Sequence, residues 1–205
     1  MKNSICNKLN EIIPNPICPL NYSKDYELLL AVMLSAQTTD ARVNALTKEL
    51  FKYNIEELAT MDIQTLERII KPLGTYRRKA IYIKEISKAL VKDFEGKVPY
   101  DRKYIENLKG VGHKTCNVVF SELFKEPTMP VDTHVSRVSK KLGLAEENDD
   151  VKVIEKKLMD YFDKKDWNKL HLQLVLFGRH HCTAKKPNCE ECPFYKKECI
   201  HTKKR

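Results

Sequence analysis

The stretch LKGVGHKTCNVV, residues 108–119, places two glycines around a single valine, and the 205-residue chain contains only six glycines. Glycine costs backbone entropy, so this pair indicates a tight turn or a close approach to the backbone. Helical patterns flank the pair at 101–108 and 113–124. We therefore expect a helix–turn–helix hairpin, whose second helix would offer free amides and a positive dipole end to an anion. Taken alone, two glycines in a turn more often only mark the end of a helix.

Apolar residues recur three or four positions apart through most of the chain, which is the period of amphipathic helices. The segments with this spacing are 26–51, 54–61, 62–73, 77–94, 101–108, 113–124, 132–144, 151–162 and 167–182. The first divides near residues 38–40, where Asp40 is expected to cap the second half, and Asp62 is expected to begin another helix. No segment alternates with period two, so the sequence predicts an all-α fold of many short helices.

The charge balance favours an anionic partner. Lys and Arg number 37 against 28 Asp and Glu, for a formal charge of +9. Nucleic acid is favoured over a membrane because no strongly basic amphipathic helix stands out, although a lysine-rich proteome would give the same total. The N-terminal residues lack the apolar block of a secretory signal, and the apolar runs are too short to span a bilayer. We expect a cytoplasmic, nucleoid-associated protein.

Seven cysteines are present, and four of them, Cys182, Cys189, Cys192 and Cys199, follow the spacing C-x6-C-x2-C-x6-C. An odd total argues against a disulfide framework, and four unrelated cysteines would rarely fall so close together. Four thiolates at this spacing can ligate a [4Fe–4S] cluster or a tetrahedral zinc ion, and the spacing leaves both open.

Taken together, five motifs resemble the endonuclease III branch of the helix-hairpin-helix DNA glycosylase superfamily, in the same order. They are MLSAQTTDARVN (33–44), GTYRRKA (74–80), LKGVGHKT (108–115), VDTHVSRV (131–138) and LFGRHHCTAKKPNCEECP (176–193). The resemblance extends from about residue 20 to Cys199. It implies a six-helix barrel with the hairpin at 21–127, an iron–sulfur domain made of 1–20 and 128–205, and a DNA-binding cleft between them. It also favours [4Fe–4S] over zinc.

The resemblance implies two catalytic residues. Lys114 stands where bifunctional members carry a nucleophilic lysine, whose neutral amine attacks C1′, expels the base and forms a Schiff base that permits β-elimination. Asp132 matches an aspartate that stabilises oxocarbenium-like charge near C1′. Without the motifs, Lys114 would be an ordinary solvated lysine and Asp132 a helix cap. Capping and catalysis are compatible, because a cap fixes the carboxylate. His134 is expected to be structural.

The DNA contacts are also implied by the resemblance. The positions concerned are Gln37, Gly110, Val111, Gly112, His113, Lys185 and Lys186. Gln37 would fill the gap that a flipped base leaves in the duplex. The hairpin residues would meet a phosphate at the start of the second helix, and the two lysines between the first cysteines suit further phosphate contacts.

Three positions depart from the family pattern. Thr75 stands where relatives often carry a bulky apolar wedge, Lys109 replaces a proline, and the last cysteine interval has six residues where five are usual. Residues 72–80 weakly repeat the hairpin, with Lys79 in the place of Lys114. This repeat lacks the second glycine, so we do not expect Lys79 to be the nucleophile.

The resemblance implies a bifunctional DNA glycosylase and AP lyase of base excision repair. Such an enzyme removes oxidised pyrimidines from duplex DNA and cleaves the abasic site. We expect it to be a monomer and to have no membrane partner. One alternative is an adenine-removing relative, which normally lacks the lysine and adds a C-terminal recognition domain. The sequence has Lys114, and no such domain is expected. The other alternative is a non-catalytic DNA-binding module, against which the pairing of Lys114 with Asp132 argues.

Overall fold

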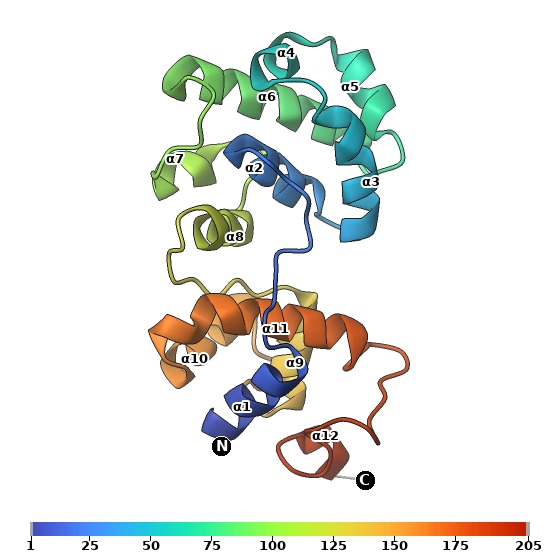
Figure 1. The fold of residues 1–205 in the computed structure, drawn as a ribbon, viewed down its shortest axis with the longest axis vertical. Coiled ribbons are helices and arrows are strands. Elements are labelled where there is room, and N and C mark those ends of the chain that lie inside the picture. The colour runs from blue at the N-terminus through green and yellow to red at the C-terminus, as the bar shows by residue number, and fades with distance from the viewer. Residues whose placement is uncertain (1, 204–205) are drawn as a thin grey trace. The chain divides into compact units, whose positions relative to one another are not determined.

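The computed structural model describes residues 2–203. All the secondary-structure elements assigned within that range are helices (Figure 1). In chain order these are α1 (Lys2–Ile12), α2 (Asp25–Leu34), α3 (Asp40–Leu50), α4 (Ile55–Thr60), α5 (Ile63–Ile70), α6 (Tyr76–Phe94), α7 (Arg102–Asn107), α8 (His113–Leu123), α9 (Thr133–Lys141), α10 (Val151–Tyr161), the 3₁₀ helix η1 (Lys164–Asp166), α11 (Trp167–His180) and α12 (Ile200–Lys203). The all-α fold predicted from the apolar spacing is confirmed.

The chain divides into two compact units. One comprises residues 18–124, and the other joins residues 1–17 to residues 125–205. The boundary near residue 125 comes directly before the proline-flanked segment 126–130. The chain thus leaves the second unit after α1 and returns to it after α8.

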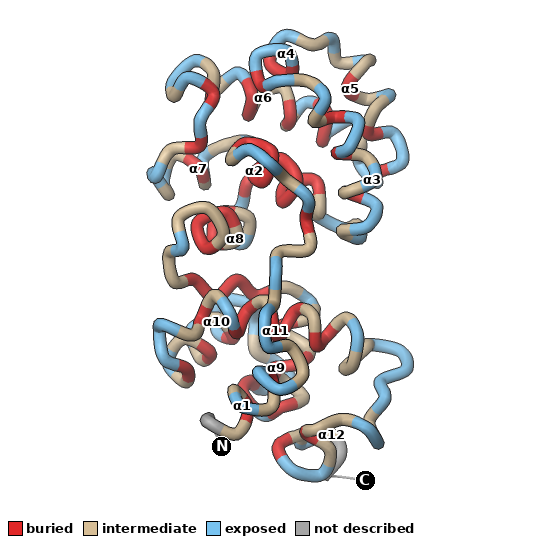
Figure 2. The backbone as a smooth tube through the Cα atoms, viewed as in Figure 1, coloured by how far each residue is buried: buried red, intermediate tan, exposed pale blue. Residues whose placement is uncertain are grey.

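Helix α2 forms the centre of the unit 18–124. It is apolar on every side, and its residues from Tyr26 to Leu34 are all buried (Figure 2). A helix of this kind needs neighbours all round. Helices α3, α6 and α8 contact it. Truncating Leu29, which is fully buried, would cost about 2–5 kcal/mol because it leaves a cavity.

Helix ends in this unit follow from local hydrogen bonds. Asp62 accepts from Thr65 N at 2.8 Å and caps α5, which confirms the predicted helix start. The prediction for α3 was wrong by one residue: Thr39 is the cap, with Oγ1 accepting from Arg42 N at 3.4 Å, and Asp40 is the first helical residue. Both residue types cap well, so the choice between these two neighbours could not be made from residue type.

The second unit packs α9 and α1 against α11. Its core includes Ile5 and Leu9 from α1, which pack with Leu174 and Phe177 of α11. Gln173 of α11 donates to Ile13 O at 2.9 Å and to Asn10 Oδ1 at 3.0 Å. These contacts explain why the first residues of the chain belong to the same unit as the last.

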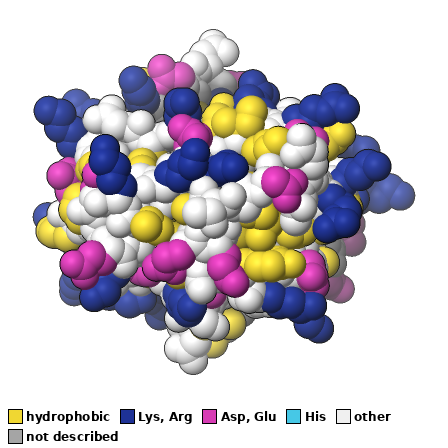
Figure 3. Space-filling view, turned by 90° about the horizontal axis from the view of Figure 1, so that it is seen from above, with side chains coloured by type: hydrophobic (Ala, Val, Ile, Leu, Met, Phe, Trp, Pro, Cys, Tyr) yellow, Lys and Arg dark blue, Asp and Glu magenta, His cyan; other side chains and the backbone are white. Residues whose placement is uncertain are grey.

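Charged side chains of both signs are mixed on the face seen from above in Figure 3, with apolar side chains between them. Positively charged side chains therefore do not cover that face uniformly. Within residues 2–203, the helices are too short or too polar to cross a membrane.

Candidate functional site

The predicted hairpin lies between α7 and α8. Its turn places Gly110 in the left-handed region with φ +82°, and Val111 N donates to Leu108 O at 3.0 Å. Val111 is buried and Leu108 packs against the same core, so both anchor the turn. Gly112 is the N-cap of α8 in an extended conformation, and Cys116 N donates to its carbonyl at 3.0 Å. No side chain therefore caps the start of α8.

The two glycines of the hairpin have different reasons to be glycine. A Cβ on Gly110 would lie 2.3 Å from the ring of Tyr82, and the left-handed φ already disfavours a side chain there. A Cβ on Gly112 would meet nothing within 4 Å. Gly110 is thus required by the fold, whereas Gly112 leaves open space beside the free amides of α8, where an anion could approach the backbone.

Lys114 is the second residue of α8 and is exposed. A ring of side chains that joins the two hairpin helices fixes its neighbour His113. Arg102 Nη1 donates to Asn117 Oδ1 at 2.6 Å, and the amide of Asn117 lies 3.1 Å from His113 Nε2. His113 Nδ1 lies 3.1 Å from Glu106 Oε1.

This ring determines the tautomer of the neutral His113 imidazole. Because Asn117 Oδ1 accepts from Arg102, its Nδ2 must donate to His113 Nε2. The proton of the imidazole then resides on Nδ1 and is donated to Glu106. The Arg102 guanidinium also lies 4.5 Å from the ring centre of Phe120, which holds the whole arrangement against the core. The sequence did not indicate that Arg102, Glu106 and Asn117 would surround His113.

Asp132 is the N-cap of α9 in the other unit. Its Oδ1 accepts from His134 N and from Val135 N, both at 2.8 Å. Both bonds go to one oxygen of the carboxylate, Oδ1. The carboxylate is partly exposed, so a substrate could reach it. The expectation that Asp132 caps a helix is confirmed, and the cap holds the carboxylate in a fixed orientation.

His134 lies two residues after Asp132, and its contacts are those of a structural residue. Its backbone and Cβ pack closely on Gly178 of α11, and Arg137 Nη2 lies 3.3 Å from its Nδ1. Burial lowers the pKa of the imidazole, with a smaller opposing effect from the Asp132 carboxylate. Partial burial of the ring disfavours its charged form.

Gln37 lies in the turn between α2 and α3 and is exposed. Its backbone is left-handed, with φ 60°. Thr75, at the start of α6, is also left-handed with φ 57°, which is unusual for a β-branched residue. Both residues line one pocket of about 210 Å³, which Gly110 of the hairpin lines as well. The structure thus brings Gln37, Thr75 and the hairpin together.

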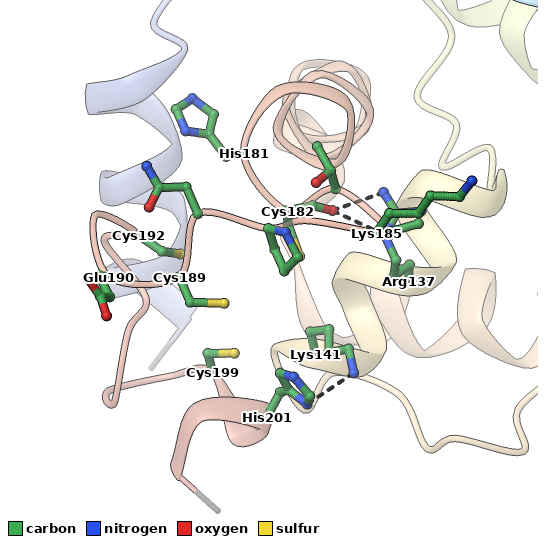
Figure 4. Close-up of a pocket in the computed structure, with 14 residues that line it drawn as sticks. Arg137, Lys141, His181, Cys182, Lys185, Cys189, Glu190, Cys192, Cys199 and His201 are labelled. Carbon is green, nitrogen blue, oxygen red and sulfur yellow. Dashed lines mark hydrogen bonds between the residues drawn. The ribbon is translucent and has the colours of Figure 1, made fainter. Parts of the chain in front are cut away.

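The four cysteines of the C-terminal motif line a single cavity of about 620 Å³ (Figure 4). Burial raises the pKa of Cys182 and Cys192. Within the described residues, no three Cys, His, Asp or Glu side chains converge closely enough to hold a single metal ion. Four thiols that line one cavity would suit a polynuclear iron–sulfur cluster.

Contacts around the cavity hold its walls in place. Arg137 of α9 donates to Cys182 O at 2.9 and 3.1 Å and to Gly178 O at 2.6 Å, which fixes the chain as it leaves α11. At the other end, Lys8 of α1 pairs with the buried Glu198 at 2.7 Å. Lys185 lines the cavity and is exposed. Lys186 is exposed beside it.

The interval between Cys192 and Cys199 contains a tight turn. Lys196 adopts a left-handed conformation with φ 51°, and the amides of Lys197 and Cys199 both donate to Phe194 O, at 3.2 and 3.1 Å. Phe194 is fully buried against Phe177. The six-residue interval thus includes this turn, and Cys199 lines the cavity.

Comparison with known proteins defines the class. Residues 30–164 match the family model described as HhH-GPD superfamily base excision DNA repair protein. Residues 182–195 match the iron–sulfur binding domain of endonuclease III. Endonuclease III of Bacillus subtilis is 46% identical over 188 residues, covering 91% of this chain and 86% of that protein. Endonuclease III of Escherichia coli is 38% identical over 190 residues, covering 92% and 90%.

Solved structures agree. A trapped endonuclease III–DNA covalent intermediate with an estranged adenine superimposes with a TM-score of 0.93 at 41% identity, covering 100% of this chain and 98% of that chain. A non-covalent endonuclease III–DNA complex gives a TM-score of 0.94 at 40% identity, with the same coverage. The chain is thus a base excision DNA repair protein of the HhH-GPD superfamily. Within it, the chain belongs to the endonuclease III family.

Membership confirms the enzyme class and the cofactor. The protein is a DNA glycosylase and AP lyase of base excision repair. Its cofactor is a [4Fe–4S] cluster, and Cys182, Cys189, Cys192 and Cys199 are the side chains that would hold it. When bound, the cluster cross-links the chain after α11.

Proposed function

We propose that Lys114 is the nucleophile and Asp132 the catalytic carboxylate of a glycosylase that removes oxidised pyrimidines from duplex DNA. The observation that carries the assignment is the exposure of Lys114 directly behind the uncapped Gly112 turn. A phosphate held by the free amides of α8 would place the neighbouring sugar within reach of the Lys114 amine. The covalent DNA intermediate of the related endonuclease III is consistent with an enzyme that attaches to its substrate.

The reaction then proceeds in two stages. The neutral Lys114 amine attacks C1′ as the base departs with its bonding electrons and a proton, which leaves an aminal at C1′. The C1′–O4′ bond then opens, O4′ takes up a proton, and the resulting iminium at C1′ is a Schiff base. Loss of a C2′ proton drives elimination of the 3′ phosphate, and water releases the amine. Asp132 Oδ2 stabilises positive charge at C1′ during base departure, because Oδ1 is engaged in the helix cap.

We further propose how the duplex is held. Gly110, Val111, Gly112 and His113 present the anion site of the hairpin, and Gln37 enters the space of the extruded base. Lys185 and Lys186 contact phosphates from the loop beside the cluster, which fixes their backbone. The enzyme acts as a cytoplasmic monomer on the DNA of the nucleoid.

Substitution of Asp132 separates base removal from strand cleavage. Asp132→Asn should lower single-turnover release of thymine glycol by about a hundredfold or more, because the charge opposite C1′ is lost. Cleavage of a preformed abasic site should fall far less, since no base has to leave. Equal loss in both assays would show that Asp132 acts on folding or DNA binding. Failure of the unsubstituted protein to nick abasic DNA would instead support the non-catalytic alternative.

A further inference from the structure

Lys79 is buried, and the reaction described above does not use it. It is the fourth residue of α6, and only 5% of its surface is exposed. Its Nζ donates to Leu34 O and to Ala36 O, both at 2.8 Å. Removing an ammonium group from water is costly unless acceptors replace the water, and these two carbonyls do so. Its amine is therefore committed to main-chain acceptors.

The two carbonyls belong to the C-terminal end of α2. Leu34 is the last helical residue, and Ala36 lies in the turn that follows. Carbonyls at this end of a helix lack intrahelical donors and lie at the negative end of its dipole. Lys79, which belongs to a different helix, supplies these carbonyls with a hydrogen-bond donor and places a positive charge at the negative end of the dipole. It thereby ties the turn after α2 to the start of α6.

That turn is unfavourable in isolation. Gln37, which directly follows Ala36, is left-handed, and the hydroxyl of Thr38 is buried without a hydrogen-bond partner among the described residues. Backbone in such a conformation persists only when the surrounding contacts over-determine it. The bond from Lys79 to the Ala36 carbonyl is such a contact, because it fixes the peptide group on which Gln37 turns.

The same pocket brings these residues together. Gln37, Thr75 and Lys79 all line it, and Lys79 N donates to Thr75 O at 3.1 Å. We propose that Lys79 is a positioning residue, which holds the turn after α2 so that the Gln37 side chain is directed at DNA. This inference rests on the proposed role of Gln37 in filling the space of the extruded base. Loss of the tether lets Gln37 return to an ordinary backbone conformation.

The chain offers a matched control for this inference. Lys84 lies in the same helix and also donates to a main-chain carbonyl, that of Met61 at 2.6 Å, but it does not line the Gln37 pocket. Lys79→Met and Lys84→Met each remove one ammonium donor and keep an unbranched side chain. The holoprotein of each variant is compared for melting temperature, thymine-glycol release from duplex DNA and cleavage of a preformed abasic site.

Lys79→Met should lower base release by about tenfold while changing abasic-site cleavage by less than about threefold, because only the first step holds a base out of the stack. Lys84→Met should change both rates by less than about threefold. Equal effects of the two variants on base release would overturn the inference. If Lys79→Met does not fold, Lys79→Gln, which keeps a shorter donor, is measured by the same criteria.

A double-mutant cycle with Gln37→Ala separates positioning from general stabilisation. If Lys79 acts through Gln37, adding Lys79→Met to Gln37→Ala should lower base release by less than about twofold further. A further tenfold loss in that background would show an effect independent of Gln37 and overturn the inference. Unchanged base release in Gln37→Ala alone would overturn the proposed role of Gln37, and the positioning role with it, while leaving Lys114 and Asp132 untouched.

Discussion

The ring of Tyr82 lies where a side chain on Gly110 would have to go, with only 2.3 Å between the ring and an added Cβ. Gly110→Ala should therefore lower the free energy of unfolding by about 2 kcal/mol or more, from left-handed strain and overpacking. Gly112→Ala meets nothing within 4 Å and should change it by less than about 0.5 kcal/mol. Denaturant titration of both variants measures the difference.

Gly112→Ala should still weaken DNA binding, because its Cβ occupies the space in front of the α8 amides. Fluorescence anisotropy with an abasic-site analogue in the duplex measures the Kd. A Kd equal to that of the unsubstituted protein would mean that no phosphate approaches the backbone at this glycine.

Lys185 and Lys186 should control part of the salt dependence of binding. Replacing both with glutamine should reduce the slope of log K against log salt by roughly one unit per lost phosphate contact. Lys164 and Lys165 of η1 are exposed and adjacent, so their double substitution makes the same change in net charge. Equal slopes for the two double variants would show that only the total charge matters.

The cysteine cavity should hold iron. Protein purified without oxygen is expected to be brown, with absorbance at about 400 nm and about four irons per chain. Cys189→Ser should lower iron content and melting temperature together, because the cluster cross-links the residues after α11. One zinc and no iron in the unsubstituted protein would contradict the assignment.

Stability should fall in mild acid through His134. Burial lowers the pKa of its imidazole, so the unfolded chain takes up a proton at a pH where the folded chain still resists it. The free energy of unfolding therefore decreases as the pH falls below about 6.5, and it stops decreasing for this group once the lower folded-state pKa has been passed. His134→Gln should flatten thermal melting against pH between about 7 and 5. The same slope in both proteins would exclude His134 as the cause.

The sequence predicted the features that depend on neighbours along the chain. The turn at Gly110 and the cap at Asp62 each require a residue type at a local position, and both lie where the pattern placed them. Asp132 likewise caps its helix. The choice of Thr39 over Asp40 could not be made, because adjacent residues of similar capping strength differ only in how the chain enters the helix.

Contacts between separate helices could not be predicted in this way. Lys79 looks like any lysine of a basic helix until α6 is packed beside the end of α2, whose carbonyls it meets. Asn117 and Arg102 become a pair only when the hairpin closes. Polar residues of this kind carry no periodic signal, since their role depends on which acceptor another helix brings to them.

Trapping with borohydride tests the central assignment most directly, because only a Schiff base between the protein and C1′ is reduced to a stable adduct. The unsubstituted protein should form this adduct with a thymine-glycol duplex. Lys114→Gln should form none while binding the duplex with a Kd within about threefold, since glutamine keeps much of the side-chain volume and removes the amine. Lys79→Gln should still form the adduct. Trapping that persists in the Lys114 variant and disappears in the Lys79 variant would contradict the assignment. The nucleophile would then be Lys79 at the start of α6 and not Lys114 at the start of α8.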